Sequence, residues 1–474
     1  MDAPAPLLNS SSSHPLANDR TISGTSRIAA VAGLPAACFL MVAIAAFFNT
    51  VDINAYFDAD DDHLSVDWPV MVKLAIAGIC GIVGVAGVIF DRSVRRSLMT
   101  LPGIFLVALA AVFLATSVVA YEETATISRA AAIINVAYLC FVPTAISILG
   151  LRRLMIACLI GMVTNLIVNW GMYLFWPAVG VFEEELGNQT FVNRMGGLGH
   201  PNAIARTGVL SSLLSLAMLR GLGEHNANTA SGQLASKARQ AVSGWSRLVL
   251  LAIIGISLLT MAAAYSRSGF AAGFMAAAVL MIDRLFSRAG ILISLSAVLV
   301  LSIGFIGVEL LSEKMIRGDS VTSMVTKTGE IDELTSATGR TEIWGEAIRL
   351  IRERPLTGWG LNSTPKLMAD FSLHTHNLLL HVCFSGGLIA GLLILILLGW
   401  NLFYGVPSPL PIVRSISTYV LVSGIFEDTV LDTFASPSTI WWFVVLLYPA
   451  IEMSRRASQT PRTGVESDSI PAYT

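Results

Sequence analysis

Long apolar runs recur along nearly the whole chain, and they constrain the fold more than any other feature. Crossing the hydrocarbon core of a bilayer, about 30 Å thick, takes roughly 20 apolar residues in an α-helix. The segments that meet this requirement are 28–48, 70–90, 101–120, 129–149, 152–176, 200–220, 247–265, 269–283, 290–309, 377–402, 412–430 and 437–453. The sequence therefore predicts an all-α polytopic membrane protein with about 12 transmembrane helices, although 269–283 is short and 412–430 becomes polar at its end.

The composition supports a membrane location. Only 13% of the 474 residues are charged, whereas about 25% are charged in a typical soluble domain. This is too little charge to cover the surface of a soluble protein of this length, which argues against soluble enzymes and disordered proteins. The net charge of −2 also provides no bulk attraction for nucleic acid. The five cysteines lie in or next to apolar runs, where we expect them to be small core residues.

The basic residues predict the orientation of the chain, because cytoplasmic loops carry an excess of Lys and Arg. One set of loops holds most of them, while the short loops of the opposite side contain only Arg129, Arg194 and Arg267. Both termini are therefore expected in the cytoplasm. The polar tails 1–27 and 454–474 are predicted to be disordered, and 28–453 to form the transmembrane domain.

A long outer segment, 311–376, separates the ninth and tenth predicted spans. Connections of this length are commonly functional. Within it, Glu342–Arg354 is predicted to form an amphipathic helix that ends before Pro355. We expect this helix to cover a cavity between the outer ends of the spans; the alternative is a helix resting passively on the membrane surface. Its apolar stripe consists of Ile343, Ala347, Leu350 and Ile351.

Two histidines mark the point where the outer segment enters a span. His374 and His376 precede the span that begins near residue 377. A side chain with a pKa near neutrality suits proton transfer or a hydrogen bond to a hydroxyl. Zinc binding is a competing interpretation of His-x-His. We expect no metal there, because His381 falls off the helix face of His376 and other ligand types are scarce nearby; plain interfacial histidines remain an alternative.

Three outer arginines, Arg194, Arg267 and Arg340, stand on a side that otherwise has few basic residues in its short loops. Guanidinium groups bind phosphate oxygens bidentately and stay charged, so a lipid diphosphate is the anion expected at this depth. Anchoring to lipid headgroups is the alternative. Arg206 differs, because it follows Asn202 by one helical turn inside a span and should face the interior of the bundle.

An acidic cluster, Asp58–His63, lies in the first outer loop. Its Asp-x-Asp pattern could hold a divalent cation for diphosphate chemistry. A solvated acidic loop is the interpretation that we favour.

Four motifs in order resemble the O-antigen ligase and polysaccharide polymerase superfamily of bacterial membranes. The resemblance spans residues 190–400 and depends on the whole ordered set, because each motif alone is weak. The motifs are Arg194-Met195-Gly196-Gly197 with His200-Pro201-Asn202-Ala203; Ser266-Arg267-Ser268-Gly269; Thr338-Gly339-Arg340 with Trp344 and Arg354-Pro355-Leu356-Thr357-Gly358-Trp359-Gly360; and His376-Asn377 with Gly386-Gly387 and Gly391.

This resemblance implies a GT-C type glycosyltransferase of the bacterial inner membrane that needs no metal or other cofactor and inverts the anomeric configuration. It implies a periplasmic site, an undecaprenyl-diphosphate-linked glycan as donor, and lipid A–core as acceptor. Arg194 and Arg267 would grip the diphosphate, and His376 would activate or orient the acceptor hydroxyl. We expect Arg340, Asn202, Arg206, His374 and Asn377 to bind diphosphate or glycan.

Two other functions stay open. A polymerase of the same superfamily would use a second lipid-linked glycan as acceptor. A polysaccharide or lipid transporter or flippase also fits the span count. No internal repeat is visible, however, and the polar residues gather at one face of the predicted bundle.

Overall fold

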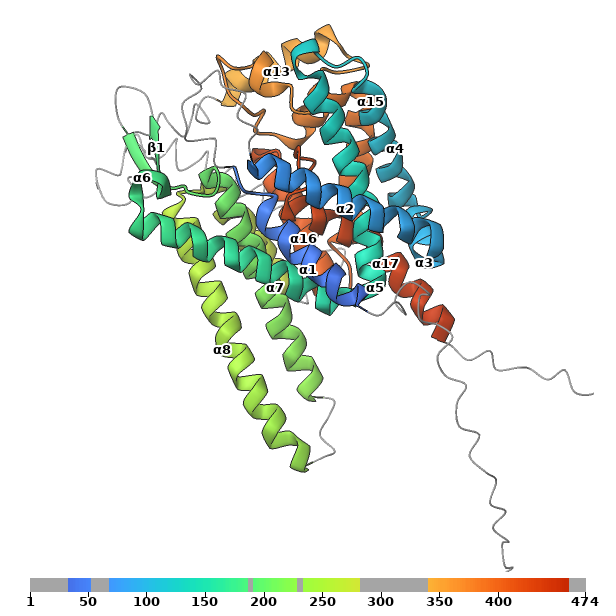
Figure 1. The fold of residues 1–474 in the computed structure, drawn as a ribbon, viewed down its shortest axis with the longest axis vertical. Helices are drawn as coiled ribbons and strands as arrows, with labels where there is room; N and C mark the ends of the chain where they lie inside the picture. Colours follow the sequence, from blue (N-terminus) through green and yellow to red (C-terminus); the bar gives the residue numbers. More distant parts are fainter. Residues whose placement is uncertain (1–32, 53–67, 186–190, 228–232, 282–339, 460–474) are drawn as a thin grey trace, which may run out of the picture.

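The computed structural model describes residues 33–52, 68–185, 191–227, 233–281 and 340–459. These ranges are mostly helical (Figure 1). The predicted span 290–309, the Asp58–His63 cluster, both tails and most of the outer segment lie outside them.

Every predicted span within the described residues overlaps a helix. The N-terminal half contains α1 (Leu34–Phe48), α2 (Trp68–Phe90), α3 (Arg92–Leu98), α4 (Leu101–Thr116), the 3-10 turn η2 (Glu122–Thr124), α5 (Ala125–Phe175), α6 (Pro177–Gly180) and the antiparallel strands β1 (Val181–Glu185) and β2 (Phe191–Met195). The remainder contains α7 (Pro201–Ala227), α8 (Gln233–Ala263), α9 (Arg267–Met281), α13 (Arg340–Glu353), α14 (Thr364–Leu367), α15 (Leu378–Trp400), the π-helix η5 (Asn401–Gly405), α16 (Pro411–Phe426) and α17 (Pro437–Gln459).

Helix length decides which of these elements can cross a bilayer alone. In the described residues, five helices are long and apolar enough, or six if the bent pair of α3 and α4 counts as one span. Helices α1, α9 and α16 are apolar but have 15 or 16 residues, fewer than the roughly 20 that a span needs. Twelve spans and their loop layout therefore remain a prediction.

Helix α5 contains two of the predicted spans, 129–149 and 152–176. Its backbone leaves the helical conformation at Gly150, with φ of 73° and ψ of 162°. Glycine adopts such positive φ values without steric cost. The two halves of α5 are thus separate helices that meet where the sequence predicted a boundary.

The interior of the bundle is built around α5, α16 and α17. Trp441 and Trp442 of α17, Tyr138 of α5 and Tyr419 of α16 are fully buried in one apolar cluster. Helix α2 instead leaves large apolar side chains such as Ile82 exposed on its outer face. An apolar interior combined with an apolar exterior is the pattern expected of helices that lie in lipid.

Helix α13 lies at one end of the molecule, beside the start of α15 (Figure 1). We refer to it as the cover helix. Its predicted apolar stripe is buried, in a cluster that also contains Trp359, Met368 and Phe384. The predicted amphipathic helix is therefore confirmed, and its apolar face packs on protein instead of resting on the membrane. The stripe residues are Ile343, Ala347, Leu350 and Ile351.

Helix α15 is broken at Gly387, where φ is 73°. The backbone groups that the break releases are paired by the turn after α13, so the 354–360 motif and the Gly386-Gly387 motif form one structural unit. The bonds are Trp359 N to Phe384 O at 2.8 Å, Gly360 N to Ser385 O at 2.9 Å, and Leu388 N to Pro355 O at 2.7 Å.

Candidate functional site

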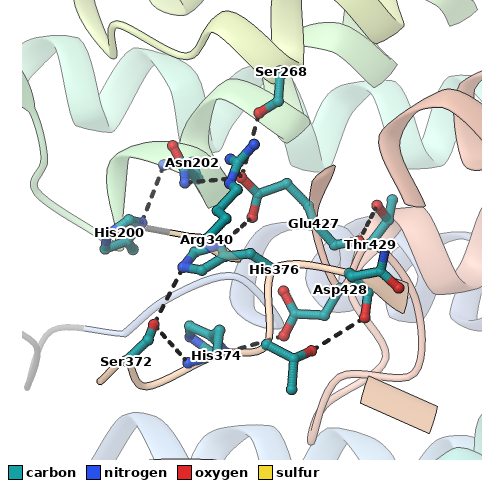
Figure 2. A network of polar contacts seen from close by, with 12 residues as sticks. His200, Asn202, Ser268, Arg340, Ser372, His374, His376, Glu427, Asp428 and Thr429 are labelled. Carbon is teal, nitrogen blue, oxygen red and sulfur yellow. Dashed lines mark hydrogen bonds and ion pairs between the residues drawn. The ribbon is translucent and has the colours of Figure 1, made fainter. Parts of the chain in front are cut away.

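One buried carboxylate joins residues from all four motifs. Glu427 follows the last residue of α16 and is 4% exposed. Its Oε1 atom lies 3.2 Å from Asn202 Nδ2, 3.3 Å from Ser268 Oγ and 3.5 Å from an Arg340 guanidinium nitrogen. Its Oε2 atom lies 3.2 Å from His376 Nδ1 (Figure 2). We call these five residues the Glu427 cluster.

The charge of Glu427 fixes the proton on His376. Burial alone would raise the pKa of Glu427, but the hydrogen bond from His376 lowers it, and the pKa lies below its usual value. A carboxylate can only accept hydrogen bonds, so the network assigns the Nδ1 proton of His376 to this contact. In a neutral ring, Nε2 is then the nitrogen that can accept a proton.

The backbone around His376 is held in an unusual conformation. His376 has φ of 49°, which is uncommon for a residue other than glycine. Asn377 next to it caps α15, because its Oδ1 accepts a hydrogen bond from Leu380 N at 3.0 Å. The Asn377 amide also donates to Ile425 O at 3.1 Å, close to Glu427. Asn377 therefore fixes the approach of His376 to Glu427.

His374 forms a second pair beside this cluster. Its Nδ1 lies 3.0 Å from Asp428 Oδ2, with the histidine side chain 52% exposed and the aspartate buried. The Asp428 carboxylate raises the pKa of His374 to about 9. Burial opposes ionisation of Asp428 too, but the neighbouring His374 holds its pKa well below the usual value. At neutral pH, His374 is thus an imidazolium, and its ring centre is 6.2 Å from that of His376.

Arg206 supports the same loop from inside the bundle, as its position in α7 predicted. Its guanidinium donates to the backbone oxygen of Asp428 at 3.3 Å. It also interacts electrostatically with Asp432 and Glu427. Arg206 therefore provides a positive charge behind the acidic turn that carries Glu427 and Asp428.

Arg194 lies on β2 and is 2% exposed. It donates to Ala264 O at 2.8 Å, to Glu184 at 2.6 Å and to Asn202 Oδ1 at 2.7 Å. Because each guanidinium nitrogen has a protein acceptor, this side chain ties the hairpin to the start of α7 and to the corner before α9. Arg194 thereby orients Asn202, which contacts Glu427 in turn.

Arg267 and Arg340 occupy the first positions of α9 and α13. Burial and the positive charge of Arg267 lower the pKa of Arg340, while Glu427 opposes the shift. The Arg340 guanidinium also lies 5.7 Å from the centre of the Phe426 ring. Arg340 thus lies between the Glu427 carboxylate and the Phe426 ring.

The structure brings most of the predicted site residues together. Three of the predicted residues contact Glu427 directly: Asn202, Arg340 and His376. Four others contact the Glu427 cluster or the backbone next to Glu427: Arg194, Arg206, His374 and Asn377. Glu427, Asp428, Ser268 and Ser372 were not among the site residues predicted from the sequence. The polar end of the predicted span 412–430 was a signal for the first two. Within the described ranges, no group of three or more His, Cys, Asp or Glu residues could hold a metal ion.

A family model described as O-antigen ligase matches residues 251–395. The matched range contains Arg267, Arg340, His374, His376 and Asn377, and it ends before Glu427. No curated protein matches the chain.

Proposed function

We propose that this membrane protein, whose residues 251–395 match a family model described as O-antigen ligase, transfers a glycan from undecaprenyl diphosphate to an acceptor hydroxyl. The observation that carries the proposal is the convergence of the four motifs on Glu427. A buried carboxylate that orients a histidine, with guanidinium groups beside it, has the parts needed for transfer from a diphosphate.

The proposed reaction is a single displacement at the anomeric carbon. The acceptor oxygen forms a bond to this carbon, and the bond to the diphosphate oxygen breaks with its electron pair. His376 Nε2 takes the acceptor proton, and Glu427 stabilises the resulting imidazolium through Nδ1. One displacement inverts the configuration, in line with the expectation from the sequence.

The departing diphosphate gains negative charge, which fixed cations can stabilise. We assign this role to Arg267 and Arg340 at the starts of two helices, and to the His374 imidazolium. The helix N-termini add partial positive charge at the same place. This arrangement supplies charge stabilisation from protein groups, in keeping with a metal-independent reaction.

The resemblance implied that Arg194 binds the diphosphate directly. Its three protein contacts and its burial instead support a positioning role. We propose that Arg194 fixes Asn202 and the corner before Arg267, while Arg206 fixes the turn that carries Asp428. Both arginines would then act through residues that touch substrate.

We propose a periplasmic site in the bacterial inner membrane, with both termini in the cytoplasm and lipid A–core as the acceptor. A polymerase that joins lipid-linked repeat units uses the same chemistry. Polysaccharide from a deletion strain distinguishes the two. A ligase leaves lipid-linked polymer unattached, whereas a polymerase leaves single repeat units.

The enzymatic role is tested with Arg267→Ala and His376→Ala in membrane vesicles that contain lipid-linked donor and acceptor. Both variants should insert normally and lose glycan transfer. Arg352→Ala, on the exposed side of α13, is the matched control and should retain it. Translocation of donor without glycan transfer by the unaltered protein would instead identify a transporter. Retained activity in excess EDTA would exclude a catalytic cation at Asp58–Asp62.

A further inference from the structure

Ser372 occupies the side of His376 that faces away from Glu427. Its Oγ lies 3.3 Å from His376 Nε2 and accepts a hydrogen bond from the backbone N–H of His374 at 3.2 Å (Figure 2). Because Nδ1 donates to Glu427, Nε2 accepts, and the Ser372 hydroxyl is the donor. Glu427, His376 and Ser372 are thus connected in the order carboxylate, imidazole, hydroxyl.

This position is the one that an acceptor hydroxyl needs. A hydroxyl that loses its proton to Nε2 must come within hydrogen-bond distance of that nitrogen. The hydroxyl of Ser372, a residue of the protein itself, already lies within this distance of Nε2. An incoming acceptor hydroxyl and the Ser372 hydroxyl therefore compete for the same nitrogen.

Ser372 is attached through its backbone to the apolar cluster that packs against α13. Its backbone N–H donates to Met368 O at 2.8 Å, and Met368 is fully buried in the cluster below α13. Trp344 of α13 donates from its indole to Thr375 O at 3.1 Å, which fixes the other side of the same loop. The serine is therefore attached to a packed element on both sides.

An activated donor beside a histidine base is open to attack by water. In that side reaction the water oxygen bonds to the anomeric carbon and the diphosphate leaves with its electron pair. Nε2 takes a water proton, and the products are a free reducing glycan and undecaprenyl diphosphate. Since water is far more concentrated than any acceptor, a transferase needs a way to keep water off this nitrogen.

We propose that Ser372 is a specificity-determining residue that occupies the acceptor position on His376 and suppresses hydrolysis of the donor until the acceptor hydroxyl displaces it. This inference rests on the proposed function and extends it to the choice between alcohol and water. The acceptor binds with enough contacts to displace one serine hydrogen bond, whereas a single water molecule does not.

The test compares the unaltered protein with Ser372→Ala and Ser372→Thr. Each full-length protein is reconstituted in vesicles with the undecaprenyl-diphosphate-linked glycan fraction extracted from a strain that lacks the chain. Reactions run in ¹⁸O-labelled water, with and without acceptor lipid from the same strain. Mass spectrometry then measures two products. ¹⁸O at the reducing end of the released glycan reports attack of water on the anomeric carbon, and glycan joined to the acceptor lipid reports transfer.

Ser372→Ala should raise the ratio of hydrolysis to transfer by roughly two- to tenfold, the range that one net hydrogen bond allows. Ser372→Thr keeps a hydroxyl at this position and should show the same ratio of hydrolysis to transfer as the unaltered protein. Leu373→Ala, at an exposed neighbouring position, is the matched control and should leave the ratio unchanged. A purely structural role of Ser372 would lower both products together and leave their ratio constant.

An unchanged ratio in an active Ser372→Ala variant would overturn the inference. A glycan found covalently attached to Ser372 would also overturn it, because the serine would then be an acceptor. Absence of both products from the unaltered protein would refute the proposed function itself, which separates the two failures.

Discussion

Replacing Glu427 by glutamine changes one atom in the centre of the site. The carboxylate accepts hydrogen bonds from Asn202 and Ser268 at Oε1, where it also forms an ion pair with Arg340, and it accepts from His376 at Oε2. Glutamine has one accepting oxygen and one donating amide. Whichever way the amide turns, a donor faces either His376 Nδ1 or the group formed by Asn202, Ser268 and Arg340.

The three contacts at Oε1 outnumber the one at Oε2, so the glutamine oxygen should take the Oε1 position. Its amide then points to His376 Nδ1, which must become an acceptor, and the ring proton moves to Nε2. A histidine in this tautomer cannot take the acceptor proton. The corresponding change in a serine protease triad lowers turnover about 10⁴-fold, and general base catalysis contributes roughly 10²- to 10⁴-fold. We expect kcat to fall at least about 10²-fold.

The assay measures initial rates of glycan transfer in vesicles at saturating donor and acceptor, together with thermal denaturation in detergent. Glu353→Gln is the matched control, because Glu353 is 46% exposed and pairs only with Arg349 among the described residues. Its transfer rate should equal that of the unaltered protein. If Glu427→Gln keeps its rate within about twofold while remaining folded, the assignment of the His376 proton is wrong.

Two predictions concern stability. Arg194→Ala leaves Glu184, Asn202 and Ala264 O without a shared donor and should lower the free energy of unfolding by about 2–4 kcal/mol; an unchanged denaturation midpoint in detergent would contradict this. The raised pKa of His374 makes its pair with Asp428 stabilising below the unfolded pKa of about 6.5, and that contribution is lost as pH rises through about 9. Melting temperature should therefore fall between these pH values, and Asp428→Asn should flatten this part of the profile; an identical slope in both proteins would refute the role of the pair.

The sequence predicted the long apolar helices, because an apolar run marks each of them. Apolar runs located the long helices, and the spacing of Ile343, Ala347 and Leu350 located α13. The break in α5 was visible as a polar boundary near Gly150. The small strands β1 and β2 were not predicted, since five residues each carry too little periodicity.

The site was predicted only in part, for a physical reason. Basic residues on the outer side are conspicuous because they are rare there, so Arg267 and Arg340 could be selected individually. Glu427 and Asp428 have no such contrast, because many outer loops are acidic. Their importance comes from burial and from partners between 51 and 225 positions away. Arg194 shows the converse, since its residue type suggested a ligand contact but its partners lie within the protein.

The shared backbone bonds between residues 355–360 and the break in α15 have a consequence for engineering. Neither the turn nor the broken helix has all its backbone hydrogen bonds without the other. The carbonyl groups of Phe384 and Ser385 accept from backbone amides in the turn that precedes α15. A chimera that exchanged the turn after α13 between two relatives would keep these bonds only where the incoming turn adopts the same backbone conformation. The smallest transplantable module therefore runs from Arg340 through Trp400, so that the cover, the histidine loop and the split helix are inherited together.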